Sequence, residues 1–144
     1  MPKSSGKIYQ KYKMRQYEII SDVKISPYAS KAKKGATYKA LWDTGSDFTA
    51  ITKKVVDDLK LRAIREIPVN TANGMMMSKE YVINVILPDN ISKLVRATEC
   101  IMNDDTDILI GMDIITDGDF AISSDVQGNM YFAYRSPSEG EIKL

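Results

Sequence analysis

Short runs of apolar and β-branched residues, each bounded by turn residues, follow one another along most of this chain. In residues 17–26 the side chains of Ile19, Val23 and Ile25 are separated by even steps, a spacing typical of a half-buried strand. Further runs predict strands at residues 36–42, 48–51, 66–71, 75–87, 91–102, 107–110, 120–123 and 130–135. Many short strands at such regular spacing predict an all-β, barrel-like domain.

Two local signals refine this pattern. Residues 53–60 place their apolar side chains on one face of a short helix, and Thr52 before them is a residue type favoured at the N-cap. Asn73-Gly74 separates two predicted strands and indicates a hairpin with a type I′ turn, because both central positions of that turn need positive φ. A shorter helix is expected to start within residues 112–115.

Both ends of the chain are polar. Residues 1–16 carry Lys3, Lys7, Lys11, Lys13 and Arg15, which predicts a basic, flexible N-terminal arm. Residues 136–144 predict a loose polar tail, so residues 17–135 are expected to form the single folded domain. Contact between the arm and nucleic acid is the less favoured interpretation.

The composition is that of an ordinary globular protein. The 144 residues are 44% hydrophobic and 27% charged, with a net charge of +1 that gives no general attraction to nucleic acid or membranes. No apolar run approaches the ~20 residues of a membrane span, and no apolar segment follows the N-terminal cations, so no secretory signal is predicted. Cys100 is the only cysteine, which favours a reducing, cytoplasmic location.

The absence of histidine narrows the chemistry further. Ser-His-Asp and Cys-His catalytic arrangements are excluded, as are the usual zinc sites that contain histidine. Acidic residues gather between Asp104 and Asp125, but they fail the calcium-loop pattern, because Ile108 stands where that loop needs glycine. Solvated turn acids are the preferred interpretation, and neither a metal nor another cofactor is expected.

The turn Asp43-Thr44-Gly45-Ser46 carries the clearest candidate chemistry. Asp-Thr-Gly is also common in ordinary turns, where aspartate bonds to backbone amides and glycine adopts positive φ. Here the turn lies between two predicted apolar strands, which places the Asp43 carboxylate at the floor of the domain. A second apolar strand that ends in glycine, at Gly111, follows well downstream.

These segments resemble those of the retropepsin-like (retroviral-type) aspartic peptidases, particularly the single-domain members from bacteria and retroelements. The matching segments are residues 41–46, the hairpin at residues 71–74 and residues 107–113, in the family's order. The similarity covers roughly residues 19–135. It implies a small closed β-barrel with one short helix, in which the strand ending at Ile110 and Gly111 passes beside the Asp43 loop. Glycine suits that position, because a residue without Cβ lets backbones approach closely.

The resemblance implies an aspartic endopeptidase that cleaves polypeptides, with Asp43 as the catalytic residue. Peptide hydrolysis by carboxylates needs two acids that share one proton; two carboxylates ~3 Å apart cannot both ionise, and aspartic peptidases are the standard example. The chain has only one Asp-Thr-Gly motif, so the second Asp43 has to come from another copy in a homodimer. Neither aspartate has a fixed role, because the dyad titrates as a pair.

The resemblance also implies roles for the neighbours of Asp43. Thr44 would bond to its counterpart across the dyad, and Gly45 would bring its backbone N–H to the carboxylate. Ser46 would bond to the outer carboxylate oxygen, with a solvated turn hydroxyl as the alternative. Ile110 and Gly111 would support the loop from the adjacent strand.

The hairpin would form the flap that closes over the substrate. Backbone groups at its tip can bond to an extended peptide while they exclude water. The flap residues expected to meet substrate are Ala72, Asn73, Gly74, Met75 and Met76. Flexible thioethers suit an adaptable apolar pocket, and partial core packing of residues 75–77 is the alternative interpretation.

Two expectations concern how copies of the chain meet. Viral members of the family form much of their dimer from paired terminal strands, whereas both ends here carry polar extensions. We therefore expect a different contact, made by residues 130–135 or by the Asp43 loop. The rival to a peptidase is a catalytically silent dimerisation or peptide-binding module on the same fold, against which the complete Asp-Thr-Gly-Ser motif speaks.

Overall fold

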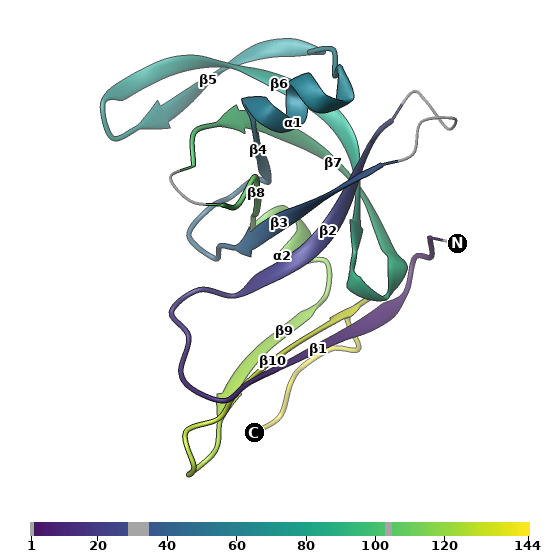
Figure 1. The fold of residues 1–144 in the computed structure, drawn as a ribbon, viewed down its shortest axis with the longest axis vertical. Helices are drawn as coiled ribbons and strands as arrows, with labels where there is room; N and C mark the ends of the chain where they lie inside the picture. The colour runs from purple at the N-terminus through teal and green to yellow at the C-terminus, as the bar shows by residue number, and fades with distance from the viewer. Residues whose placement is uncertain (1, 29–34, 103–104) are drawn as a thin grey trace.

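The computed structural model describes residues 2–28, 35–102 and 105–144 (Figure 1). Most of the described residues lie in strands, arranged as a barrel with a smaller sheet beside one end. The elements are β1 (Gly6–Tyr12), β2 (Ile20–Pro27), β3 (Ala36–Trp42), β4 (Ala50–Thr52), α1 (Lys53–Leu59), β5 (Arg65–Thr71), β6 (Gly74–Leu87), the 3₁₀ turn η1 (Pro88–Asn90), β7 (Ile91–Cys100), β8 (Ile108–Ile110), α2 (Met112–Ile115), β9 (Asp119–Ser124) and β10 (Met130–Ser136).

The barrel closes because β2 pairs at both of its sides. The strand order is β2-β3-β8-β4-β7-β6, and β6 pairs again with β2, while β5 extends the hairpin outside this circle. The β3–β8 and β4–β7 pairs are parallel and the others antiparallel. A closed circle leaves no unpaired edge among its strands. The predicted all-β closed barrel is confirmed.

Alternation along the strands fills the barrel. In β6 the side chains of Tyr81, Ile83, Val85 and Leu87 are buried, and the residues between them are only half-buried. The two-residue period of a strand sends every second side chain to one face, so this apolar set forms one wall of the core. Helix α1 closes over it with its three buried apolar residues.

The second sheet, called here the terminal sheet, has the order β1-β10-β9. Its first strand corrects the expectation of a flexible arm, because residues 6–12 pair with β10 along their whole length. Only Ile8 among the inward positions of β1 is both apolar and buried, and Gln10 interrupts the apolar alternation. Local pattern was therefore too weak to predict this strand, and pairing with β10 determines it.

Further contacts hold the N-terminal segment to the barrel. The backbone of Lys3 exchanges hydrogen bonds with Asn90 and Ser92 at 2.8 Å each. The Asp89 carboxylate accepts from the Lys3 ammonium at 3.0 Å and from the Lys7 backbone N–H at 2.9 Å. These hydrogen bonds lower the pKa of Asp89, with the Lys7 backbone as the largest cause.

The C-terminal part departs from expectation in one respect. Residues 130–135, which with the Asp43 loop are one of the two expected contacts with a second copy, form β10, the central strand of the terminal sheet, with β1 on one side and β9 on the other. Both edges of β10 are therefore occupied within one chain. Beyond β10, the polar tail has no helix or strand, although Ser138 and Glu139 hydrogen-bond to Asp119.

Smaller differences concern the helices and loops. Thr52 stands at the N-cap of α1, but its hydroxyl donates to Asp107 at 2.8 Å and makes no capping bond. The expected helix at residues 112–115 forms as α2. Residues 29–34, and Asp104 among the acidic residues considered for calcium, lie outside the described residues. In the part of the chain that is described, none of the helices has the length and apolar character required to cross a membrane.

Candidate active site

The Asp43 loop, residues 43–49, leaves β3 and returns as β4. The backbone N–H of Asp43 donates to the carbonyl oxygen of Ile110 in β8 at 2.9 Å. The Gly45 N–H donates to Oδ1 of the Asp43 carboxylate at 2.8 Å, and the Ser46 N–H closes the turn on the Asp43 carbonyl at 3.3 Å. Asp43 is half-buried, while Thr44 and Gly45 are exposed. The Asp43 backbone is thus bonded to β8, and its carboxylate accepts one main-chain hydrogen bond while it remains only half-buried.

Gly111 lies against the far side of the same loop. A Cβ at Gly111 would lie 2.5 Å from the Phe48 carbonyl carbon and 2.6 Å from its oxygen. Parallel pairing of β3 with β8 brings Trp42 opposite Ile110. The next residue after β8, Gly111, therefore lies against Phe48 of the Asp43 loop. The predicted passage of residues 108–111 beside the Asp43 loop is confirmed, and glycine is there because backbone atoms leave no room for a side chain.

Thr49 and Asp113 form a contact that the sequence did not predict. The Asp113 carboxylate accepts from the Thr49 hydroxyl at 2.8 Å and from the Thr49 N–H at 3.1 Å. The fully buried Thr49 hydroxyl oxygen also accepts from the Gly111 N–H at 3.3 Å. Asp113 was assigned only to the start of α2, and Thr49 only to a strand. An acid two residues after the glycine is the signal that pointed to this region.

Helix α2 also holds the loop through its backbone. The Met112 N–H donates to the Ser46 carbonyl at 2.8 Å, and the Asp113 N–H donates to the Asp47 carbonyl at 3.1 Å. These bonds satisfy N–H groups that a helix N-terminus otherwise leaves unpaired. The start of α2 and the Asp43 loop are therefore one hydrogen-bonded unit.

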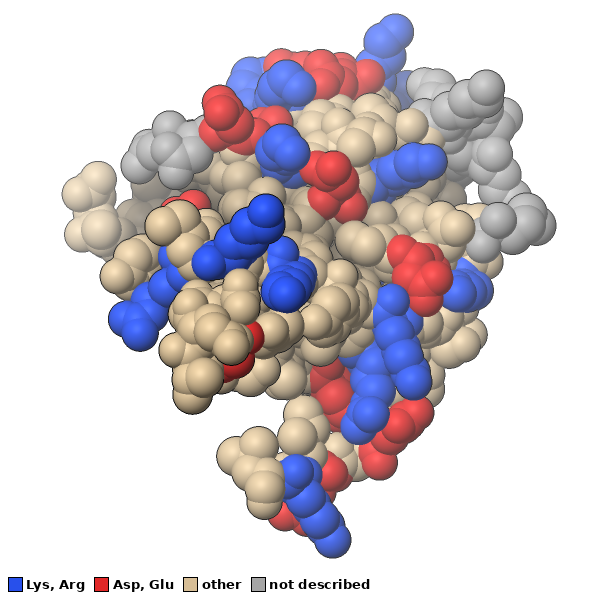
Figure 2. Space-filling view, turned by 60° about the horizontal axis from the view of Figure 1, so that its bottom comes forward, with Lys and Arg blue, Asp and Glu red and all other residues tan. Residues whose placement is uncertain are grey.

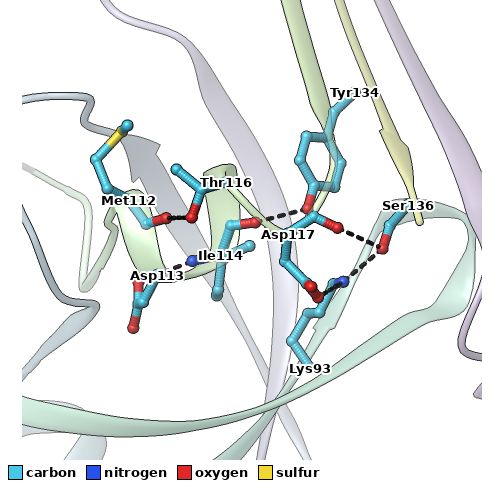
Figure 3. Close-up of polar contacts among 8 residues, drawn as sticks. All are labelled: Lys93, Met112, Asp113, Ile114, Thr116, Asp117, Tyr134 and Ser136. Atoms are coloured by element: carbon cyan, nitrogen blue, oxygen red, sulfur yellow. Dashed lines mark hydrogen bonds and ion pairs between the residues drawn. The ribbon is translucent and has the colours of Figure 1, made fainter. Parts of the chain in front are cut away.

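The other end of α2 is fixed between the barrel and the terminal sheet (Figure 3). Tyr134 donates its hydroxyl to the Ile114 carbonyl at 2.7 Å, and burial is the main cause that raises the pKa of Tyr134 to about 12. Lys93 of β7 donates to the Asp117 carboxylate and to the Ser136 hydroxyl, both at 2.5 Å. Lys93 is 9% exposed, and its ammonium joins the buried Ser136 hydroxyl to the exposed Asp117 carboxylate.

Trp42 connects the terminal sheet to the residue beside Asp43. Its ring centroid lies 5.1 Å from that of Phe132, 5.0 Å from Tyr134 and 6.0 Å from Phe120. The indole N–H donates to the Ser21 hydroxyl at 2.9 Å, as a buried tryptophan requires. The start of the Asp43 loop therefore rests on β9 and β10.

Two expected roles can be compared with the geometry of the single chain. Gly45 brings its N–H to the Asp43 carboxylate, as expected. The Ser46 hydroxyl donates instead to the Phe48 carbonyl at 2.8 Å, so in this chain it contributes to the loop conformation. Thr44 is exposed, and its bond across a dyad stays a prediction.

The β5–β6 hairpin is the predicted flap. Thr71 pairs with Gly74, which leaves Ala72 and Asn73 as the loop. Gly74 has a φ of 104°, whereas Asn73 is not among the non-glycine residues with positive φ. The predicted type I′ turn is therefore wrong. The Thr71 hydroxyl closes this turn, accepting from the Asn73 N–H at 3.2 Å and donating to the Gly74 carbonyl at 2.8 Å.

The three methionines of the hairpin project from the fold. Met75, Met76 and Met77 are 63%, 57% and 60% exposed. Among the described residues, none of the three belongs to the hydrophobic core or to the side chains packed against it, so their interpretation as partial core packing is wrong. The hairpin thus presents flexible apolar groups to solvent, next to a glycine that has open space around it.

Charges and metal-binding groups do not suggest a second chemistry. In residues 2–28, 35–102 and 105–144, no cluster of three or more His, Cys, Asp or Glu side chains is arranged to hold a metal ion. The face in Figure 2 carries basic and acidic groups interspersed. Ion pairs such as Lys39–Asp22 at 3.0 Å neutralise cations locally, which does not favour a continuous surface for nucleic acid.

Sequence comparison relates this chain to one family. The profile of the family described as "gag-polyprotein putative aspartyl protease" matches residues 32–117. This range contains the Asp43 loop, the β5–β6 hairpin and Gly111. No curated protein matches the chain significantly in sequence.

Structure comparison finds similar folds. A retropepsin-like aspartic protease from Rickettsia conorii is 14% identical over 94% of this chain and 98% of its own, with a TM-score of 0.53. The EIAV protease, solved in complex with the inhibitor HBY-793, is 17% identical over 71% and 88%, with a TM-score of 0.54. The Simian Foamy Virus (mac) protease is 17% identical over 68% and 92%, with a TM-score of 0.50. At these identities the likeness establishes the fold.

Proposed function

This chain belongs to the gag-polyprotein aspartyl protease family, and we propose that it is an aspartic endopeptidase in which two copies each supply Asp43. The observation that carries the proposal is half-buried Asp43, whose carboxylate accepts a main-chain hydrogen bond from Gly45 and whose backbone is bonded to β8, in a loop that exposes Thr44 and Gly45. A catalytic acid has to be held in one orientation and yet be open to water and substrate. The Asp43 loop meets both conditions.

The chemistry follows from a pair of carboxylates that share one proton. One Asp43 takes a proton from the attacking water, and the protonated partner donates to the oxygen of the scissile carbonyl. Among the described residues, no second Asp-Thr-Gly loop lies beside Asp43, so a two-fold axis has to bring in the partner's Asp43. Thr44, exposed at the tip of the loop, is proposed to bond to its counterpart across this axis.

The hairpin is proposed to close over the substrate. Ala72, Asn73 and Gly74 would offer backbone groups to an extended polypeptide, and Met75 and Met76 would contact its apolar side chains. Their exposure supports this role, since a flap without substrate has no other cover. The single cysteine, half-buried Cys100, supports action in a reducing compartment such as the cytoplasm.

Asp43→Asn tests the proposal. The variant removes the shared proton chemistry and keeps the size of the side chain, so cleavage of a denatured protein should fall at least ~100-fold. The melting temperature should remain close to that of the parent. Asp57→Asn is the matched control, because Asp57 lies on the surface of α1 in an ion pair with Lys53; it should cleave at the parental rate.

Two outcomes would count against the proposal. Equal cleavage by Asp43→Asn and by the parent would exclude Asp43 as the catalytic group. A parent protein that dimerises but cleaves nothing between pH 4 and 7 would favour the silent dimerisation or peptide-binding module.

A further inference from the structure

Helix α2 is too short to fix its own position. It has only four residues, Met112–Ile115, and at a rise of ~1.5 Å per residue it is about 6 Å long. A helix of this length is not stable without tertiary contacts. The contacts on its two sides therefore determine where it lies, and a displacement on one side is passed on to the other.

The N-terminal side of α2 holds the later part of the Asp43 loop. The first two N–H groups of the helix donate to the carbonyl oxygens of Ser46 and Asp47. The Asp113 carboxylate accepts two further hydrogen bonds, both from Thr49. Three residues of the Asp43 loop thus take their positions from α2.

The C-terminal side of α2 rests on Tyr134 of β10 (Figure 3). Tyr134 is 1% exposed, and its hydroxyl donates to the Ile114 carbonyl at 2.7 Å. Gly118, in the turn after the helix, permits this approach, because a Cβ there would lie 2.6 Å from Cζ and 2.7 Å from the hydroxyl oxygen of Tyr134. The end of the phenol is therefore enclosed by the segment that leaves α2.

The ring of Tyr134 also supports the start of the Asp43 loop. Its centroid lies 5.0 Å from that of Trp42, and Trp42 directly precedes Asp43 in the chain. The hydroxyl of the same residue supports α2, which holds the later residues of the loop. One buried side chain thus contacts both supports of the loop.

A second contact fixes α2 to β10 beside Tyr134. Tyr134 and Ser136 are both buried, two residues apart on one face of the strand. Lys93 joins the Ser136 hydroxyl to the Asp117 carboxylate with hydrogen bonds of 2.5 Å each. The segment that leaves α2 is therefore held at two points, and loss of the contact with Tyr134 would let the helix tilt about the other.

We infer that Tyr134 is a positioning residue for the proposed peptidase: its hydroxyl, acting through α2, sets the orientation of the Asp43 loop. The inference rests on the proposed function, because that function gives the orientation of Asp43 its effect on catalysis. Tyr134 is buried beneath the loop and takes no part in proton transfer. A misplacement of ~1 Å at a reacting group can slow a reaction about 100-fold, so a support at this place can control the rate.

Tyr134→Phe tests the inference, because it removes the hydroxyl and keeps the ring beside Trp42. The Ile114 carbonyl retains a second donor, the Asp117 N–H at 3.1 Å, so the variant should remain folded. With saturating substrate it should cleave ~10-fold more slowly than the parent.

Tyr38→Phe is the matched control. Tyr38 is 5% exposed, and its hydroxyl donates to Asp58 of α1 at 2.9 Å, so the variant loses a comparable hydrogen bond without a change at α2. It should cleave at the parental rate. The fluorescence of Trp42, the only tryptophan, should show that both variants keep the packing around the loop.

A nuclear magnetic resonance measurement follows the loop without cleavage. The Gly45 N–H donates to the Asp43 carboxylate at 2.8 Å, so the chemical shift of this amide depends on how the two groups are placed. Tyr134→Phe should shift the Gly45 amide resonance, and Tyr38→Phe should leave it in place.

The pH profile of cleavage distinguishes a displaced loop from a loss of folded protein. Carboxylates that lie farther apart repel each other less, so Tyr134→Phe should bring the two apparent pKa values of the dyad closer together. Partial unfolding would lower the whole profile and keep its shape.

Thr49→Val shows whether α2 carries the effect. Thr49 and Tyr134 bond to different residues of the helix, and the losses from two independent changes would multiply. If both act through α2, the double variant should cleave at most about twofold more slowly than the slower single variant.

The outcomes separate this inference from the proposed function. If the Gly45 resonance of Tyr134→Phe stayed in place, the positioning role would be overturned, and cleavage that depends on Asp43 would leave the peptidase intact. A shifted Gly45 resonance in a variant whose parent cleaves nothing would overturn the peptidase and keep the link between Tyr134 and the loop. Multiplied losses in the double variant would overturn transmission through α2.

Discussion

Replacing Gly111 with alanine should displace the Asp43 loop. The backbone of Gly111 has φ −93° and ψ −175°, which alanine adopts without strain, so the effect is purely one of space. The new Cβ would lie 2.5 Å and 2.6 Å from the Phe48 carbonyl carbon and oxygen. Overfilling a packed region costs about 1–3 kcal/mol. Because these neighbours are backbone atoms that cannot rotate away, we expect about 2–3 kcal/mol.

For a chain of this length, a loss of 1 kcal/mol lowers the melting temperature by ~3–4 °C. Gly111→Ala should therefore melt ~6–12 °C below the parent, and the folded fraction should cleave more slowly because the loop has moved. Gly128→Ala is the control: nothing lies within 4 Å of its Cβ, and its φ of 89° costs only about 1 kcal/mol. If Gly111→Ala melted within ~2 °C of the parent and cleaved at the parental rate, the close-approach argument would be refuted.

Two further predictions concern the supports of the terminal sheet. A hydrogen bond from Ser138 is the largest of the causes that lower the pKa of Asp119 to about 2. The stability that ionised Asp119 contributes is therefore complete above the unfolded pKa near ~4 and is lost as the pH falls toward 2. Asp119→Asn should flatten the fall of the urea midpoint between pH 4 and 2, and a fall parallel to that of the parent would contradict this. Lys93→Ala should lose ~1–3 kcal/mol in urea unfolding, since it leaves the buried Ser136 hydroxyl without its donor. Lys93→Met keeps the packed stem and should lose less. Equal stability of Lys93→Ala and the parent would exclude this role.

Local sequence signals predicted the barrel well because its strands combine alternation with clear punctuation. Residues 36–42 alternate and end at the Asp-Thr-Gly turn, and the strand forms with those bounds as β3. The glycine at Gly111 marked a close approach that the Phe48 contact explains. The contact between Thr49 and Asp113 was not predictable, because 64 residues separate the two side chains and the position of Asp113 after Gly111 does not identify its partner.

The errors have a common physical origin. Strand β1 carries lysines on its outer face and Gln10 on its inner face, so composition suggested a solvated arm. Its strand state is determined by pairing with β10, which lies more than 100 residues later. The flap turn was misassigned for a similar reason: Asn-Gly favours a type I′ turn locally, but the Thr71 hydroxyl stabilises an alternative with only glycine at positive φ.

The terminal strands pair within one chain, so folding of the terminal sheet does not require a second copy. β10 receives both neighbours from its own copy, and Trp42 beneath the Asp43 loop is covered by aromatic rings of the same copy. The described contacts beneath the Asp43 loop therefore all come from one copy. In the proposed dimer, a second copy would add the other Asp43 carboxylate. Formation of the proposed dimer follows mass action, and a folded but inactive monomer is the expected state of the dilute protein.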